Sequence, residues 1–205
     1  MLHVKNLTYF KFAKGRCQKM ANVYLQTPLT MEDVLNLHAG DEVFLNGVIY
    51  VARDAAHKRF LELLDKNQPL PLDLKNQIIF YAGPTPPKPG QVIGSIAPTT
   101  ASRMDPYTPA MFEYGVKGVI GKGPRGQKVK DACKEHQAIC FSAVGGLSAL
   151  LSDKIQSAEV VAYEDLGPEA IRQLIVKDFP VMVVYDAHGN DLYEQEIAKY
   201  RTIQR

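Results

Sequence analysis

Residues 116–146 read VKGVIGKGPRGQKVKDACKEHQAICFSAVGG, and this stretch decides the fold class. It predicts a short buried strand over 116–121, a glycine-rich turn, a helix, and a second buried strand that begins near Ala138. A strand, a helix and a strand in this order are typical of proteins in which helices cover a sheet. The stretch therefore indicates an α/β or α+β fold.

The same alternation continues on both sides of this stretch. Apolar spacing and a capping residue at Thr30 predict a helix over 30–38, and a second helix is expected over 55–67. Further strands are expected in 78–83, 154–166 and 179–191, and a further helix after Pro106 or Pro109. These elements together predict a mixed sheet.

Residues 42–52 carry the strongest turn signal in the chain. Two short β-rich runs, EVFL and VIYVA, flank the dipeptide Asn46-Gly47. This dipeptide favours a two-residue turn between antiparallel strands. We therefore expect a hairpin here, with Arg53 directly after its second strand.

The composition is that of an ordinary globular protein. The chain has 205 residues, of which 46% are hydrophobic and 22% charged, and its formal net charge is +2. No long block of Lys and Arg favours nucleic acid as a partner. No apolar run approaches the roughly 20 residues that a membrane span needs. The basic residues are better interpreted as contacts for small anions.

Residues 1–20 precede the predicted elements. They are basic but have no continuous apolar core before a cleavage site, so they make a poor secretory signal. We interpret them as an N-terminal extension, with Met20 as an alternative start. An organellar transit peptide stays open as an alternative, because the stretch lacks Asp and Glu.

The cysteines favour a reducing compartment. Cys17, Cys133 and Cys140 are odd in number and irregularly spaced, which argues against a disulfide framework. Their spacing fits neither a zinc site nor a ferredoxin. We expect Cys133 and Cys140 to be core thiols, and we expect the protein in the cytoplasm.

The stretch IAPTTASRMD (96–105) is the strongest candidate for a functional site. Pro98 fixes a turn before two adjacent hydroxyls, Thr99 and Thr100, and Arg103 follows. If one helical turn joins them, the Thr99 hydroxyl and the Arg103 guanidinium lie on one face. A hydroxyl can move a proton, and a guanidinium suits a carboxylate or phosphate. The pattern predicts a site for a small anion.

The segment GKGPRG (121–126) has two competing interpretations. It matches the G-x-G-x-x-G pattern of dinucleotide-binding turns, but the next strand ends without the acidic residue expected about 20 residues on. A Walker loop fails too, because Gln127 follows Gly126. A glycine turn at a helix N-terminus still favours an anion, and Lys122 adds a positive charge. The alternative is a tight connection with solvated basic residues.

Three cations, Arg53, Arg103 and Lys122, each occur at a turn after a predicted strand. Such turns commonly meet at one edge of a sheet. Three cations and a hydroxyl suit a small di- or tricarboxylate, but they supply no strong base, nucleophile or metal. For Arg53 the alternative is a surface ion pair with Asp54. His57, one turn onward, is more typical of a structural or exposed histidine.

Several long motifs resemble the β subunit, or C-terminal β domain, of class I iron–sulfur fumarases and tartrate dehydratases. They occur in order from about residue 25 to the C-terminal region, and they are GDEVFLNGVIYVARDAAHKR (40–59), IFYAGPTPPKPGQVIGSIAPTTASRMD (79–105), GVIGKG (118–123), FSAVGG (141–146), EDLGPEAI (164–171) and DFPVMVVYDAHGND (178–191).

The resemblance implies a swivelling β/β/α domain over 21–205, with residues 1–20 outside it. It implies reversible hydration of fumarate to L-malate, or dehydration of a tartrate. In the family a [4Fe–4S] cluster is held by three cysteines of the α part. The resemblance therefore implies a hetero-oligomer in which an α subunit ligates the cluster and this chain contributes no metal ligand.

Four residues take roles from the matching motifs. Thr99 falls on the proposed catalytic base. Arg53, Arg103 and Lys122 fall on the cationic groups that bind the substrate. The residue patterns alone single out the same four. The resemblance assigns no role to Thr100.

The motifs leave alternatives for the substrate and for the function. The C-terminal motifs favour the fumarase branch over the tartrate branch. Pro168 departs from the expected pattern, and we expect it to lie far from the site. A non-catalytic subunit for dicarboxylate binding or assembly is a hypothesis from a different class. A nucleotide-dependent oxidoreductase rests on residues 121–126 alone.

Overall fold

The computed structural model describes residues 8–13, 16–143, 146 and 148–201, with side chains from Asn22 onward. The strands are β1 (Thr8–Ala13), β2 (Arg16–Ala21), β3 (Val23–Thr27), β4 (Glu42–Val51), β5 (Ile78–Phe80), β6 (Gly118–Gly121), β7 (Ile139–Ser142), β8 (Ile155–Ala162) and β9 (Ile171–Tyr185). The helices are α1 (Met31–Asn36), α2 (Asp54–Asp65), α3 (Thr108–Tyr114), α4 (Gln127–Glu135), α5 (Ser148–Ser152) and α6 (Leu192–Tyr200), with 3-10 helices η1 (Ala101–Met104) and η2 (Glu164–Glu169).

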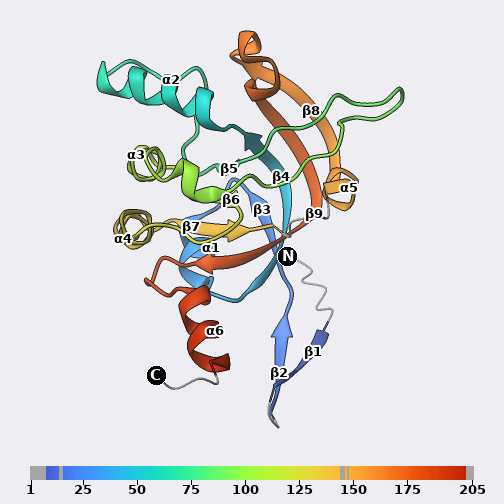
Figure 1. The fold of residues 1–205 in the computed structure, drawn as a ribbon, viewed down its shortest axis with the longest axis vertical. Coiled ribbons are helices and arrows are strands. Elements are labelled where there is room, and N and C mark those ends of the chain that lie inside the picture. Colours follow the sequence, from blue (N-terminus) through green and yellow to red (C-terminus); the bar gives the residue numbers. More distant parts are fainter. Residues whose placement is uncertain (1–7, 14–15, 144–145, 147, 202–205) are drawn as a thin grey trace.

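The main sheet has the strand order β3-β4-β5-β6-β7-β9-β8 (Figure 1). The strands from β3 to β7 run parallel, and β9 runs antiparallel to β7 and β8. Because β9 also pairs with β4, the sheet closes on itself. β1 and β2 form a separate antiparallel pair. The predicted α/β class with a mixed sheet is confirmed.

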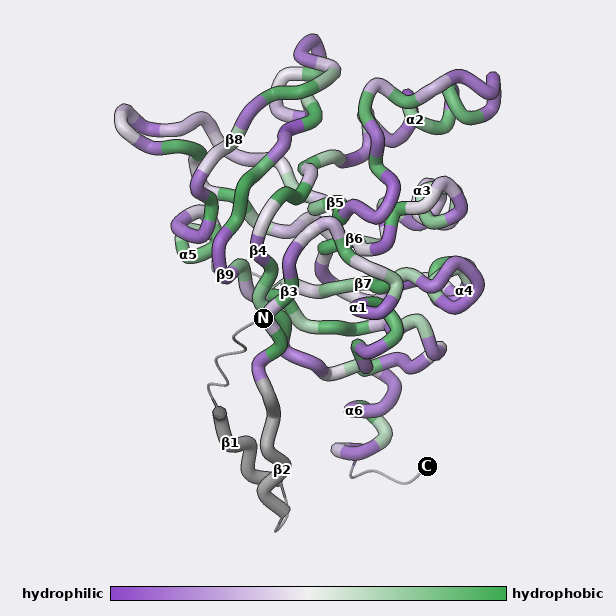
Figure 2. The backbone as a smooth tube through the Cα atoms, turned by 180° about the vertical axis from the view of Figure 1, so that it is seen from behind, coloured by the Kyte–Doolittle hydropathy of each residue, from purple (hydrophilic) through white to green (hydrophobic). Residues whose placement is uncertain are grey.

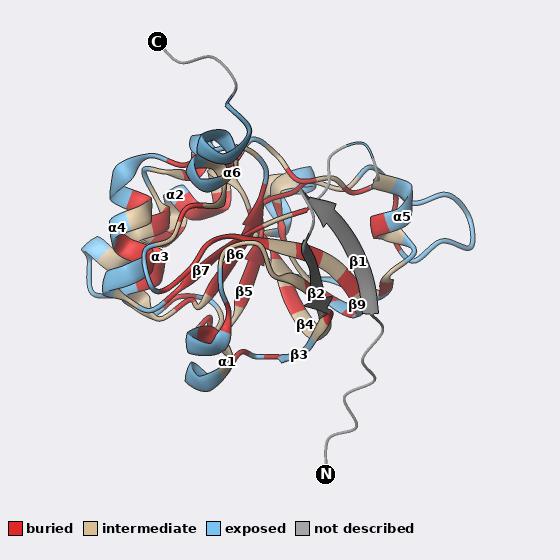
Figure 3. Cartoon of the chain, turned by 90° about the horizontal axis from the view of Figure 1, so that it is seen from below, coloured by how far each residue is buried: buried red, intermediate tan, exposed pale blue. Residues whose placement is uncertain are grey.

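Each face of the sheet carries its own apolar cluster. β5 and β6 are buried along their whole length, as expected for parallel strands that are covered on both faces. Phe80 and Phe141 belong to the cluster on the enclosed face, whereas Ile79 and Val119 pack on the opposite face against α2, α3 and α4. Figure 3 shows these buried strands at the centre and exposed helix surfaces around them.

Local sequence rules explain the helices. The Thr30 hydroxyl accepts the Asp33 N–H at 3.1 Å, and the Asp33 carboxylate accepts the Thr30 N–H at 2.8 Å, which makes a capping box. Pro109 lies in the first turn of α3, where its missing N–H costs nothing. The tube of α4 is largely hydrophilic in Figure 2, because only its inner side faces the core.

The hairpin expected at Asn46-Gly47 is wrong. β4 is one continuous strand that pairs with β3 on one side and β9 on the other. Gly47 has φ of +107°, and the register with β9 shifts between Leu45 and Gly47. Lys177 and Asp178 of β9 lie opposite the single residue Asn46, so the dipeptide faces a β-bulge in β9. The Asn46 carboxamide accepts the Asp178 N–H at 3.0 Å, a partner that local turn preferences do not reveal.

One strand has other boundaries than expected, and one was not expected. β9 begins at Ile171 rather than at Phe179, and it continues through polar residues because it pairs with β4 and β8 along that part. β3 was not expected, since it is short and only partly buried at the edge of the sheet.

Replacing Gly47 by alanine tests the bulge. A Cβ at this position would lie 2.9 Å from the carbonyl oxygen of Thr27, in addition to the strain of a positive φ. We expect Gly47→Ala to lower the free energy of unfolding by about 3 kcal/mol. The control Gly90→Ala has φ of +82° but no atom within 4 Å, so it should cost about 1 kcal/mol. Urea denaturation followed by circular dichroism measures both, and equal losses would contradict the role of the contact with β3.

Candidate functional site

The candidate site lies where the parallel strands end (Figure 1). Arg53 directly follows Ala52 after β4 and is the N-cap residue of α2. Lys122 follows β6. The chain after β5 makes a long excursion and returns with Thr99 and Arg103. Neighbouring parallel strands end at the same edge of a sheet, so all four residues gather there.

The excursion after β5 is a narrow ribbon. The Thr85 N–H donates to the Ser95 carbonyl at 3.0 Å, and Ala82 bridges to Pro98. A Cβ on Gly94 would lie 2.2 Å from the Thr85 carbonyl oxygen, so only glycine permits this approach. The two arms of the ribbon therefore return the chain next to the end of β5.

Backbone hydrogen bonds hold Thr99 beside Lys122. The Thr99 N–H donates to the Tyr81 carbonyl at 2.8 Å, and the Lys122 N–H donates to the Thr99 carbonyl at 3.2 Å. The Ala101 N–H then donates to the Lys122 carbonyl at 2.8 Å, which makes a parallel bridge between Thr100 and Lys122. Thr99 is partly buried, whereas Thr100 and Lys122 are exposed.

The helical turn that would place Thr99 and Arg103 on one face does not form. The helix here is η1, a 3-10 helix over Ala101–Met104, and Thr99 precedes it in the bridge to Lys122. The backbone of Thr99 is engaged by Tyr81 and Lys122, so it cannot also take helical geometry. Thr99 and Arg103 are brought together by the turn, without sharing a helix face.

Asp54 connects the two arginines. Its Oδ2 accepts a hydrogen bond from Arg103 Nη2 at 2.9 Å and lies 3.5 Å from Arg53 Nε. The ion pair between Arg53 and Asp54 that the sequence left as an alternative is therefore present, and it is shared. The Arg53 side chain is only 25% exposed, whereas that of Arg103 is 52% exposed.

The segment around Pro168 lies next to Arg53, and the expectation that it is far from the site is wrong. Glu169 Oε1 lies 3.2 Å from Arg53 Nη2, and Glu169 Oε2 accepts the Ala55 N–H at 2.8 Å. The Pro168 carbonyl oxygen would lie 3.7 Å from a Cβ on Gly83. η2 and α2 pack against each other across a long sequence separation, which no local pattern could reveal.

The glycine turn before α4 holds an anion from the chain itself. The N–H of Gly126, the N-cap residue of α4, donates to Asp105 Oδ2 at 2.7 Å. Asp105 therefore occupies the helix N-terminus that the sequence offered to a substrate anion. This turn is the tight connection left open above, and Lys122 remains the exposed cation beside it.

Arg125 is buried, and its charge is satisfied. Its Nε donates to Asp105 Oδ1 at 2.6 Å, and its Nη2 donates to the Thr108 hydroxyl at 2.6 Å. The Thr108 hydroxyl also lies 2.9 Å from that of Tyr81 and donates to a carbonyl of η1 at 2.8 Å. Burial disfavours the charged guanidinium, but Cys140, Tyr81 and Asp105 outweigh it and raise the pKa of Arg125.

His57 is a structural residue of α2. It is fully buried, and its Nδ1 donates to the Arg53 carbonyl at 2.9 Å. Its ring packs against Phe60, Tyr81 and Tyr107. Burial lowers the pKa of His57 from 6.5 to about 4, so the imidazole is neutral at pH 7.

A comparison with known protein families identifies the family of this chain. The family model described as Fumarase C-terminus matches residues 3–196. The chain belongs to this fumarase C-terminus family. The matched range includes most of residues 1–20, the stretch interpreted above as an N-terminal extension.

Curated relatives agree with the family. The chain is 40% identical over 161 residues to "Fumarate hydratase 2" of Leishmania major, which covers 78% of this chain and 28% of that protein. It is 39% identical over 177 residues to "Putative fumarate hydratase class I" of Geobacillus stearothermophilus, covering 84% of this chain and 34% of the relative. "Putative L(+)-tartrate dehydratase subunit beta" of Methanocaldococcus jannaschii is 37% identical over 178 residues, covering 84% of this chain and 91% of the relative.

The two thiols that the structure describes do not by themselves form an iron–sulfur site. Cys133 and Cys140 are buried core thiols, as expected, with sulfur atoms 3.5 Å apart between α4 and β7. Two thiols are fewer than a cluster needs. The side chain of Cys17 lies outside the described residues. Elsewhere in the described part of the chain, no three His, Cys, Asp or Glu side chains are placed to hold a metal ion.

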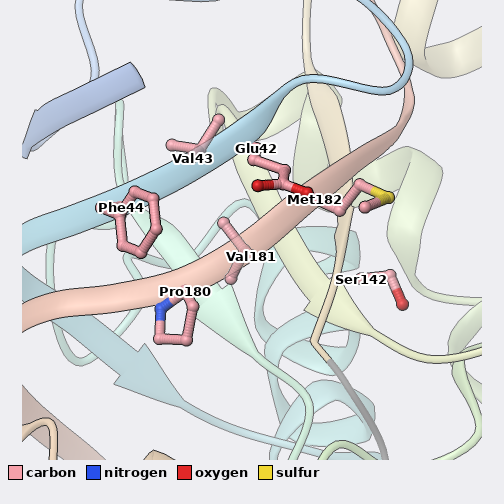
Figure 4. Close-up of a pocket in the computed structure, with 7 residues that line it drawn as sticks. All are labelled: Glu42, Val43, Phe44, Ser142, Pro180, Val181 and Met182. Atoms are coloured by element: carbon pink, nitrogen blue, oxygen red, sulfur yellow. The ribbon is translucent and has the colours of Figure 1, made fainter. Parts of the chain in front are cut away.

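A small cavity of about 120 Å³ lies elsewhere in the domain, between β4, β7 and β9. Figure 4 shows its lining, which consists of Glu42, Val43, Phe44, Ser142, Pro180, Val181 and Met182. This cavity is mainly apolar, and its one charged residue is acidic, so it does not suit a dicarboxylate.

The sequence patterns missed the carboxylates of the site. Asp54 was noted only as a partner for Arg53, and nothing local marked Glu169, although it lies in a motif that matches the family. The sequence patterns also give no role to Arg125, which anchors Asp105.

Substituting His57 by phenylalanine should flatten the dependence of stability on pH. The folded protein holds His57 with a pKa of about 4, below the ordinary 6.5, so the unfolded chain binds the proton more strongly between these values. The contribution of neutral His57 to the free energy of unfolding is complete above pH 6.5. It falls by up to about 3 kcal/mol as the pH drops towards 4. Urea unfolding between pH 4 and 7 measures this.

The comparison at pH 7 serves as the control for this prediction, because the wild-type imidazole is neutral there and any difference reflects packing. A variant that loses stability between pH 6.5 and 4 as steeply as the wild type would contradict the role of His57.

Proposed function

We propose that this chain is the β component of a [4Fe–4S] hydro-lyase that hydrates fumarate reversibly to L-malate. Its relatives bear the names of fumarate hydratases and a tartrate dehydratase, which are hydro-lyases. The chain spans 28–34% of the length of the fumarate hydratases described above, so the activity of those whole proteins is carried over as a proposal.

The gathering of cations around the Thr99 turn is the observation that carries the proposal. Arg53 and Arg103 share Asp54, and Lys122 is bridged to the backbone of Thr99 and Thr100. Two guanidinium forks and an ammonium group are suited to bind the two carboxylates of a C4 acid.

The same cations would also stabilise the reaction. When the proton leaves C3 of malate, negative charge develops on the adjoining carboxylate. Fixed cations stabilise charge that develops in the transition state more than they stabilise the ground state. Arg53 is suited to this role, because its carboxylate partners hold it before the substrate arrives.

Thr99 is the proposed proton-transfer group. Hydrogen bonds to Tyr81 and Lys122 fix its backbone on both sides. The side chain that carries the hydroxyl therefore starts from a fixed position next to the end of β5. A free threonine hydroxyl is a weak base. The neighbouring cations would lower the pKa of this hydroxyl, and a partner surface that excludes water would strengthen their effect.

The cluster is proposed to belong to a partner α subunit. The described thiols of this chain do not fit it, and one relative is named as a "subunit beta". We expect a hetero-oligomer in the cytoplasm that takes a small dicarboxylate and neither nucleic acid nor membrane. No helix in the described ranges is long and apolar enough to cross a bilayer.

Tartrate is the second candidate substrate. The tartrate dehydratase subunit is the relative whose length the chain covers best, at 91%. Anaerobic assays of the co-expressed pair on fumarate and on each tartrate decide between them. Turnover of a tartrate without turnover of fumarate would overturn the fumarase assignment.

Thr99→Ala tests the chemical role. In the assembled enzyme we expect kcat to fall by about 10²–10³-fold, because the proton-transfer group is lost. Thr99→Ser, which keeps a hydroxyl, should retain much of the activity, and Thr100→Ala is the matched control next to it. Size-exclusion chromatography verifies that the complex remains intact. An unchanged kcat in Thr99→Ala would favour a non-catalytic binding or assembly subunit.

The chain purified alone should hold no cluster and should not hydrate fumarate, because its described thiols cannot ligate one. Iron and acid-labile sulfide analysis after anaerobic reconstitution, together with a fumarate assay, measures this. Turnover by the isolated chain would refute the need for a partner.

A further inference from the structure

We propose that Glu169 is a positioning residue that aims the Arg53 guanidinium at the substrate. This inference rests on the proposed function, since it concerns the binding of a dicarboxylate by Arg53. Glu169 belongs to η2 and lies far from Arg53 in the sequence, and the fold alone brings them together.

The two oxygens of Glu169 hold two different groups. Oε1 lies 3.2 Å from Arg53 Nη2, and Oε2 accepts the Ala55 N–H at 2.8 Å. Ala55 is in the first turn of α2, two residues after Arg53. One carboxylate therefore fixes the guanidinium relative to the start of the helix on which Arg53 stands, which a simple surface ion pair does not do.

Each nitrogen of the Arg53 guanidinium has a close neighbour. The carboxylates of Asp54 and Glu169 approach Nε and Nη2, respectively. Nη1 lies beside Gly83, where a Cβ would come within 2.9 Å of it. A side chain at this position would displace the guanidinium, so glycine permits the orientation in which Glu169 holds it.

Glu169 also prevents an alternative pairing. Asp54 already accepts a hydrogen bond from Arg103 and lies 3.5 Å from Arg53 Nε. Without the second carboxylate, the Arg53 guanidinium would be free to turn fully onto Asp54, and both arginines would compete for one acceptor. A substrate carboxylate would then have to displace that pair.

The segment that carries Glu169 is braced from two sides. Arg172 of β9 donates to the carbonyls of Gly167 and Ala170, each at 3.2 Å. Arg59 of α2 pairs with Asp165, with Nη1 and Oδ1 2.9 Å apart. The carboxylate of Glu169 is thus held by a fixed backbone, as positioning requires.

Glu169→Gln in the assembled enzyme is the test, with Asp165→Asn as the matched control. Both variants remove a carboxylate charge that ties η2 to α2, but only Glu169 contacts Arg53. We expect Glu169→Gln to raise KM for fumarate, and the dissociation constant of the unreactive analogue succinate, about tenfold. It should also lower kcat, because Arg53 is proposed to stabilise the charge that develops in the transition state. Asp165→Asn should change all three much less, because its ion pair with Arg59 is exposed and Arg172 still holds the backbone of η2.

The succinate dissociation constant is measured by calorimetry, so it does not depend on turnover. Equal effects of the two variants, or no effect of Glu169→Gln, would overturn the positioning role. The proposed function would fail if the wild-type complex bound succinate but neither hydrated fumarate nor dehydrated a tartrate. A selective loss of succinate binding in Glu169→Gln would still support the inference in that case. No succinate binding by the wild type would overturn both.

Discussion

The buried ion pair between Arg125 and Asp105 is the constraint on which the site depends. Arg125 comes from the turn before α4, and Asp105 ends the η1 turn that carries Arg103. The same carboxylate accepts the N–H of Gly126, so one group joins η1 to the N-terminus of α4. Removing Asp105 would leave the charge of buried Arg125 in a largely dry environment, which is far more costly than losing an exposed pair.

The closed sheet provides the frame for this link. Pairing of β4 with β9 encloses one apolar cluster, and α2, α3 and α4 cover the opposite face. Both faces are thereby used for stability, and the edge where the parallel strands end remains for chemistry. Polar residues at that edge, such as Arg53 and Lys122, need not be covered by the core, and carboxylates there balance part of their charge.

Local chemistry made much of the fold predictable. The Thr30 capping box, the glycine turn into α4 and the apolar runs of β5 and β6 all follow from short-range rules. The errors have one cause. Asn46-Gly47 lies within one continuous strand, opposite a bulge in β9, because β4 has partners on both sides. The turn before α4 took Asp105 as its anion. Distant segments decided both outcomes.

The sequence by itself determined the residue types of the site and their order: a hydroxyl and three cations, each at a turn after a strand. Those follow from motifs and from strand and turn propensities, which act over a few residues. Only the tertiary structure decided which acidic groups hold those cations. Asp54 serves both arginines, and Glu169 reaches Arg53 from η2. Contacts between distant segments form when the sheet closes and buries its apolar faces, and no local pattern encodes which carboxylate will then face which guanidinium.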